Sequence, residues 1–386
     1  MRFVARFKQW ILWCSVATTV SLVGVWPSQA HSDGTLPSEL STLLNADTDA
    51  GFSMATGPRI FEFPRDHGPH PDFRNEWWYM TGNLDAADGR RFGFELTFFR
   101  FAVAPEPAAS ESAWRTNQVY IAHFAVTDAD GKTFYVAERF SRGALGLAGA
   151  DTNPFRVWID DWEMASTTAE GDREQWRLQA NDDDFALSLQ LVAEKAAVLN
   201  GDEGLSQKSA VIGNASYYYS ITRWQTEGQM RLGDEVFTVS GLSWLDREWS
   251  SSSLGSDQKG WDWFALQLSD GSELMFYNLR KTDGSQDVHS AGTWTFADGR
   301  SRHLDRNEVS VSVTKEWTSP KGGSYPSAWD IRIPQFGLTL SLAPVLDDQE
   351  LFTTVRYWEG AVDIEGAHRE AKVTGRGYVE LTGYAN

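Results

Sequence analysis

The chain has 386 residues, a formal net charge of −19 at pH 7, 18 tryptophans and a single cysteine. The negative charge disfavours nucleic acid and anionic membrane surfaces as partners, because both are negatively charged themselves. One cysteine cannot form an intramolecular disulfide, so the stability of the fold has to come from its core. Abundant tryptophan and glycine without long helical periodicity favour a β-rich protein with aromatic interiors.

Residues 1–30 have the pattern of a cleaved secretory signal peptide. A basic head, "MRFVARFK", precedes a mostly apolar stretch at 10–25, and "PSQA" places small residues at the −3 and −1 positions of a cleavage site after Ala30. A membrane anchor is disfavoured because a spanning helix needs roughly 20 apolar residues. Lipidation at Cys14 is disfavoured by the bulky tryptophan before it. We therefore expect a periplasmic or secreted protein.

The pattern of the rest of the chain indicates an internal duplication. The stretch "EWWYMTGNLDAADGRRFGFEL" resembles "GWDWFALQLSDGSELMFYNL", so that Trp77 matches Trp261 and Tyr79 matches Trp263. Further pairs follow in the same order: "DADGKTFYV" with "FADGRSRHL", "DDFALSLQL" with "PQFGLTLSL", and "VSGLSWLD" with "VTGRGYVE". Collinear matches of this kind indicate a tandem repeat rather than chance similarity.

The matches divide the chain into two copies, with a linker-like "SSSSLGSDQ" between them. We predict an N-terminal domain over residues 58–249 and a C-terminal domain over 250–386. An N-terminal extension, 31–57, precedes them and is expected to hold one short helix at 38–45, because its leucines there share a face.

Each copy is a series of short alternating strands. Apolar residues occupy every second position of "RFGFELTFFRF", "FALSLQL" and "VSVSV", and Asp-Gly pairs between such runs predict hairpin turns. Roughly eight strands per copy predict two tandem antiparallel β-barrels, each able to hold side chains or one small apolar ligand inside. The predicted fold class is all-β.

Acids beside tryptophans are the candidate catalytic groups. In "EWWY", a strand would direct Glu76 and Trp78 to one face and Trp77 and Tyr79 to the other. A buried Glu76 beside tryptophan would have a raised pKa and could donate a proton. The alternative, which the residues leave open, is an ion pair with an arginine at the barrel mouth.

A second acidic run, "WLDREW", would place Asp246 and Glu248 on one face of a strand and Arg247 on the other. Two neighbouring acids can divide the acid and base roles between them. The alternative is a charged network that clamps the two domains together, which the acid Glu380 at the matching position of the second copy favours.

The remaining polar residues favour structural interpretations. His67 and His70, in "HGPH", indicate a polar turn rather than a metal site, because a turn seldom brings two rings to one point. His123 lies in a predicted strand of alternating polarity, where a histidine is more typical of a core residue that has its hydrogen bonds satisfied. Lys208 lies in a glycine-rich loop before "SYYYS", whose tyrosines suit a ligand cavity. No common catalytic or nucleotide-binding motif is present, and we expect neither a metal nor a cofactor.

The segments "FPRDHGPHPDFRNEWWYMTGNL", "NGDEGLSQKSA", "GLSWLDREWSSS" and "GRGYVELTGY" resemble the AttH-type secreted proteins, which are related to carotenoid 1,2-hydratases. The resemblance runs in order through nearly all of the chain after the signal. It implies two lipocalin-like β-barrels packed against each other. It also implies an apolar isoprenoid or lipid substrate, hydrated by protonation without a cofactor, and an ABC transporter permease as a partner.

This chain departs from the hydratase pattern at two places. Where the hydratases have an Asp-His-Asn-Trp turn, this chain has "DREW", which ends at Trp249. Where they have a Tyr-Asp pair, it has Tyr277 and Asn278. The second difference replaces the implied proton-donating acid by an amide.

We therefore expect a protein that binds a hydrophobic small molecule, either an isoprenoid or a lipid. The alternatives are a hydratase, lyase or cyclase without cofactor, and a structural accessory protein of a transporter whose barrels are filled by their own side chains. The expected ligand-binding residues are Trp77, Trp78, Tyr79, His123, Tyr218, Trp249, Trp261, Trp263 and Asn278, and the expected catalytic acids are Glu76, Asp246 and Glu248.

Overall fold

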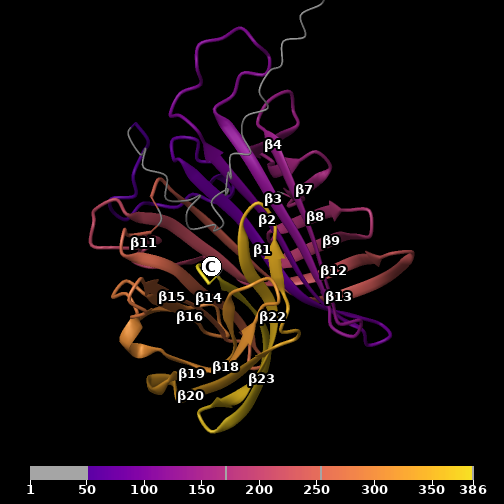
Figure 1. The fold of residues 1–386 in the computed structure, drawn as a ribbon, viewed down its shortest axis with the longest axis vertical. Helices are drawn as coiled ribbons and strands as arrows, with labels where there is room; N and C mark the ends of the chain where they lie inside the picture. Colours follow the sequence, from indigo (N-terminus) through magenta and orange to yellow (C-terminus); the bar gives the residue numbers. More distant parts are fainter. Residues whose placement is uncertain (1–50, 170–171, 253, 385–386) are drawn as a thin grey trace, which may run out of the picture. The chain divides into compact units, whose positions relative to one another are not determined.

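The computed structural model describes residues 51–169, 172–252 and 254–384, so the predicted signal peptide and the helix expected at 38–45 lie outside the described residues. The described residues form two antiparallel β-sheets (Figure 1). None of their helices is long and apolar enough to cross a membrane. The helices are single 3-10 turns: η1 (Arg65–His67), η2 (Arg306–Glu308) and η3 (Pro334–Phe336).

The first sheet runs in the order β4-β3-β2-β1-β13-β12-β9-β8-β7-β6-β5, with β10 and β11 paired to β12. β6 also contacts β3 and β4, which nearly closes the sheet into a barrel. Its strands are β1 (Asn75–Ala86), β2 (Arg91–Ala102), β3 (Gln118–Asp128), β4 (Thr133–Arg142), β5 (Ala148–Thr152), β6 (Phe155–Ile159), β7 (Trp162–Ser166), β8 (Gln175–Asn181), β9 (Phe185–Ala193), β10 (Val198–Leu199), β11 (Leu205–Gln207), β12 (Ala215–Leu232) and β13 (Glu235–Ser250).

The second sheet runs in the order β17-β16-β15-β14-β23-β22-β20-β19-β18, with β21 paired to β22, and forms a half-barrel. Its strands are β14 (Gln258–Leu268), β15 (Glu273–Lys281), β16 (Ala291–Thr295), β17 (Ser301–Asp305), β18 (Ser310–Thr318), β19 (Ser324–Ile333), β20 (Leu338–Pro344), β21 (Glu350–Phe352), β22 (Arg356–His368) and β23 (Ala371–Leu381).

The two sheets share one strand order, which confirms the predicted all-β fold of two tandem copies. β1 lies between β2 and β13, and β14 lies between β15 and β23 in the same way. The repeated phrases "VSGLSWLD" and "VTGRGYVE" are therefore the last long strand of each sheet. The predicted domain limits stay predictions, although β13 ends at Ser250 and β14 begins at Gln258.

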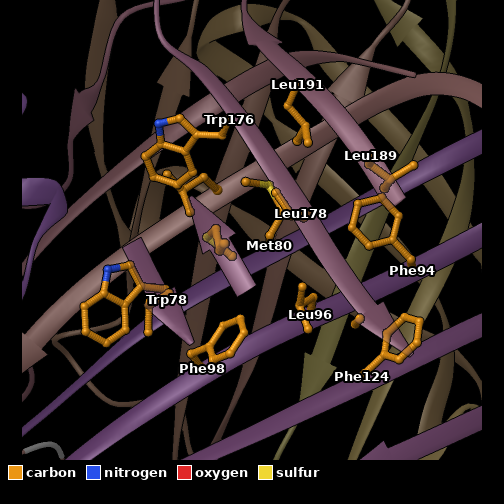
Figure 2. Packing of buried hydrophobic residues seen from close by; sticks show 14 of the residues in the cluster. Trp78, Met80, Phe94, Leu96, Phe98, Phe124, Trp176, Leu178, Leu189 and Leu191 are labelled. Carbon is orange, nitrogen blue, oxygen red and sulfur yellow. The ribbon is translucent and has the colours of Figure 1, made fainter. Parts of the chain in front are cut away.

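Alternate side chains of these strands form a separate core inside each sheet. Figure 2 shows Trp78 and Met80 of β1 with side chains of β2, β3, β8 and β9, among them Trp176. The second core is built in the same way around Trp294, Trp329 and Trp358. The interior of each barrel is thus occupied by the chain's own aromatic and aliphatic side chains.

Ion pairs join the two sheets where their outer faces meet. Lys195, in the loop between β9 and β10, and Arg223 of β12 both bind Glu273 of β15, each at 2.6 Å. Elsewhere Arg91 of β2 binds Asp363 of β22 at 2.6 Å. Charged side chains thus connect the two sheets directly.

Trp176→Ala tests the packing of the first core. Trp176 is fully buried, and its ring centre lies 4.5 Å from that of Phe155 and 5.1 Å from that of Trp224. Truncation should lower the free energy of unfolding by about 3–5 kcal/mol, because it leaves a cavity. Urea denaturation measures the change. Trp114→Ala, at a side chain 51% exposed, is the control and should change it by less than about 0.5 kcal/mol. Equal losses in both variants would contradict the assigned core.

Candidate functional site

A pocket with a cavity volume of about 80 Å³ lies between the outer faces of the two sheets. Successive strand residues alternate between faces, so Trp77 and Tyr79 point away from the core that contains Trp78. Trp261 and Trp263 of the second sheet also line the pocket. The complete lining is Trp77, Tyr79, Phe99, Lys208, Tyr218, Asp246, Glu248, Leu254, Trp261, Trp263, Tyr277, Leu279, Tyr357 and Glu380.

Equivalent positions of the two copies meet in this pocket. Tyr79 is opposite Asp246 in the first sheet, and Trp263 is opposite Glu380 in the second. The tryptophan two positions earlier in β1 and in β14 also lines the pocket. The duplication therefore supplies two related sets of one acid and two aromatic residues to a single site.

Asp246 is buried in one wall of the pocket and accepts three hydrogen bonds. Ser220 Oγ donates at 2.5 Å, Trp244 Nε1 donates at 2.7 Å, and the Tyr218 hydroxyl donates to the other carboxylate oxygen. Burial raises the pKa of Asp246 to about 7, although these hydrogen bonds favour the ionised form. At neutral pH the group is therefore present in both protonation states.

Glu380 belongs to a group of buried carboxyls with raised pKa values. Glu359 lies directly opposite it on β22, and Glu95 of β2 interacts with both. Burial raises the pKa of Glu380 to about 8 and that of Glu95 to about 8. Burial, followed by the charges of Glu380 and Glu95, raises the pKa of Glu359 well above its usual range. The Tyr79 hydroxyl donates a hydrogen bond to Glu359. These acids are protonated at neutral pH and can donate protons.

Glu248 and Lys208 form a buried ion pair in the same pocket. Lys208 Nζ lies 2.9 Å from Glu248 Oε1, and the Ser216 hydroxyl donates to the same oxygen. Burial opposes the charged form of the lysine, but the charge of Glu248, its hydrogen bond, and the nearby Tyr277 and Asp246 together outweigh burial and raise the pKa of Lys208. The pocket therefore contains an ammonium group together with neutral acids.

Glu76 lies on the other face of β1 and does not line the pocket. Its carboxylate binds Arg100 and Arg247, the latter at 2.5 Å. Burial alone would raise the pKa of Glu76, but the two guanidinium charges hold it well below its usual range. The raised pKa expected for a buried Glu76 is therefore contradicted, and the alternative arginine pair is what the structure contains. Because Arg247 binds Glu76, it takes no part in the expected clamp with Asp246 and Glu248.

Trp78 and Trp249, expected at the ligand site, belong to the first core instead. Trp78 Nε1 donates to the backbone carbonyl of His67 at 2.8 Å, and the Trp249 ring stacks on His70 with a centroid distance of 3.7 Å. Both histidines are thus packed against the core, in agreement with the structural interpretation of the "HGPH" turn. No group of three or more His, Cys, Asp or Glu side chains in the described part of the chain is arranged to hold a metal ion.

His123 and Asn278 also lie outside the lining. His123 Nδ1 is 2.7 Å from the hydroxyl of pocket residue Tyr357, and Nε2 is 3.0 Å from Glu138 Oε1. The Glu138 side chain is 22% exposed, so a hydrogen-bonded chain runs from the pocket to the surface. Asn278 Nδ2 donates to Asp262 at 3.2 Å, away from the pocket.

The predicted set contains seven of the lining residues: Trp77, Tyr79, Tyr218, Trp261, Trp263, Asp246 and Glu248. The sequence favours a structural role for Glu380 and does not indicate Lys208, Tyr277, Tyr357 or Phe99 as site residues. The duplication was the available signal for Glu380, because it matches Asp246. Strand alternation would have placed Phe99 opposite the core residue Phe98.

Residues 54–384 match the AttH-like family model, and the chain belongs to the AttH-like family. A solved AttH structure from Nitrosomonas europaea is 33% identical with a TM-score of 0.75, covering 86% of this chain and 100% of that one. The structure of kievitone hydratase from Nectria haematococca is 15% identical with a TM-score of 0.65, and the match covers 89% of this chain and 98% of that one. The structure of CghA with Sch210972 is 13% identical with a TM-score of 0.50, and the match covers 89% of this chain and 97% of that one. The last two share the fold. None of the curated proteins compared with the chain matches it.

Glu380→Gln should change how stability depends on pH. Because folding raises the pKa of this carboxyl from 4.5 to about 8, its contribution is complete below pH 4.5 and is lost as the pH rises to about 8. The amide imitates the neutral acid, so the variant should gain up to about 4 kcal/mol over the parent at pH 8 and little at pH 4.5. Denaturant unfolding at both pH values measures this. Glu365→Gln, at an exposed residue of β22, is the control. An identical pH dependence in the parent and Glu380→Gln would refute the buried neutral acid.

Proposed function

We propose that this chain binds an apolar small molecule in the pocket between its sheets and acts on it by acid catalysis of the hydratase or lyase type. The observation that carries the proposal is the pairing of aromatic walls with two buried carboxyls, Asp246 and Glu380, in one pocket. Aromatic faces bind an apolar body and stabilise developing positive charge. A neutral carboxylic acid supplies the proton.

The two acids differ in a way that suits addition of water to a carbon–carbon double bond. Glu380 is protonated at neutral pH and donates its proton to one carbon. Water then adds to the resulting cation, and the ionised fraction of Asp246 accepts the proton which that water releases. One water is added overall, and a proton passes from Asp246 back to Glu380 through solvent to complete the cycle. The reverse sequence eliminates water. The name of kievitone hydratase, which shares the fold, supports this reaction class.

The pocket has to widen to admit such a ligand. An apolar cavity of about 150 Å³ accommodates benzene, whereas this one measures about 80 Å³. Trp77 and Trp261 line the pocket and are partly exposed, so their side chains can rotate without leaving a buried core. We propose that ligand entry displaces these two indoles.

Binding without turnover is the second candidate. Asn278 favours it, because related hydratases are expected to have an acid at this place. In that case the chain would carry an isoprenoid or lipid, and the expected link to an ABC transporter permease belongs to this alternative.

Export also stays a prediction: protein from the periplasmic fraction should begin at His31.

Turnover of farnesol, an isoprenoid with trisubstituted double bonds, tests the proposal. The protein in ¹⁸O-labelled water should yield a product that has gained one labelled water, detected by mass spectrometry. Glu380→Gln should slow this reaction by about 10²–10⁴-fold, because it removes the proton donor, while quenching of tryptophan fluorescence by farnesol is retained.

Glu365→Gln, on the exposed face of β22, is the matched control and should react like the parent. Saturable quenching without a hydrated product in the parent would reject the enzymatic proposal in favour of binding alone. Absence of both would reject the pocket as a farnesol-type site.

A further inference from the structure

We infer that the pocket contains an oxygen-binding subsite, formed by Lys208, Ser206 and Tyr277, which selects uncharged oxygenated apolar ligands over hydrocarbons and over anions. The inference rests on the proposed function, because it concerns the same pocket. It adds the chemical class of the ligand and the end of the pocket at which its oxygen binds.

The three side chains form a hydrogen-bonded row that joins the two sheets. Lys208 Nζ lies 3.0 Å from Ser206 Oγ, and Ser206 Oγ lies 2.9 Å from the Tyr277 hydroxyl. The ammonium group also lies 4.5 Å from the centre of the Tyr277 ring. Ser206 is completely buried behind the row, whereas Lys208 and Tyr277 line the pocket.

The row leaves hydrogen-bond donors for a ligand. An ammonium group has three N–H bonds, and two of those of Lys208 are used by Ser206 and Glu248. Ser206 accepts from the lysine and can donate its own proton to the Tyr277 oxygen, so the Tyr277 O–H is available as well. Two donors at one wall fit a ligand oxygen that accepts hydrogen bonds.

The charges around the row select against an anion. Glu248 neutralises Lys208 at 2.9 Å, so the lysine is not an unpaired cation. The ionised fraction of Asp246 adds negative charge to the same pocket. A carboxylate or phosphate ligand would be repelled, whereas a hydroxyl, phenol or ketone oxygen accepts the hydrogen bonds without that cost.

The apolar clusters indicate where the rest of the ligand lies. Tyr277 belongs to a cluster that Trp77 and Trp261 also contact. The same two tryptophans contact a second cluster, which contains Phe99 and Tyr357. A ligand whose oxygen binds at Tyr277 therefore extends its apolar body past the two indoles toward Phe99.

Three probes with one carbon skeleton test the subsite: farnesene, farnesol and farnesoic acid. Their Kd values for the intact protein at pH 7.5 are measured by quenching of tryptophan fluorescence. We expect farnesol to bind at least tenfold more tightly than either of the others. In the double variant Lys208→Met/Glu248→Gln, which removes both charges together, farnesol should bind no better than farnesene, whose own Kd should stay the same.

Tyr277→Phe is the second variant, because it deletes one hydroxyl and retains the ring under the lysine. It should reduce the preference for farnesol by threefold or more without changing the Kd of farnesene. Equal Kd values for the three probes, or tightest binding of farnesoic acid, would overturn the subsite and leave the proposed function intact. Failure of all three probes to bind would overturn both.

Discussion

Carboxyl groups are buried among aromatic rings where the two sheets meet, and the rest of the site follows from this. A charge in a low-dielectric interior costs free energy unless it is paired or neutralised. The chain uses both solutions within a short distance. Glu248 is paired with Lys208, whereas Glu380 and Glu359 avoid the cost by binding protons. The pattern of partners thus decides which acids can donate a proton.

The buried acids where the sheets meet differ in how completely they are paired, and therefore in what they cost in free energy. The ion pairs of Glu273 with Lys195 and Arg223 hold the sheets together, as charged groups with complete sets of partners do. Glu359 differs, because its Oε2 has no hydrogen-bond partner among the described residues. An amide or apolar side chain would fit the same place at lower cost in free energy. An acid at this place despite that cost fits the proposed proton-donating site.

Most of the fold could be predicted from the sequence, because alternation and repeated phrases record strand faces and strand order directly. The site was predicted in part. Strand alternation places Trp77 and Trp78 on opposite faces of β1. Because both are aromatic, the local sequence does not tell which of the two faces the core. The state of Glu76 depends on Arg100, which lies opposite it in the β1–β2 hairpin, and on Arg247 of β13, which is 171 residues away in the sequence. Lys208 reaches the pocket from a loop, where no periodicity indicates the direction of a side chain.

The duplication places two acids at equivalent positions, yet their neighbours differ. Asp246 is opposite Ser220, which donates a hydrogen bond to it, whereas Glu380 is opposite a second glutamate, Glu359. A symmetric homodimer would have to present identical neighbours to both acids. Fusion of the copies into one chain removes that requirement, so the two halves of the pocket can specialise. Under the proposed function, a ligand would meet a proton acceptor on one side and a donor on the other, which would give the site a direction that two identical subunits could not provide.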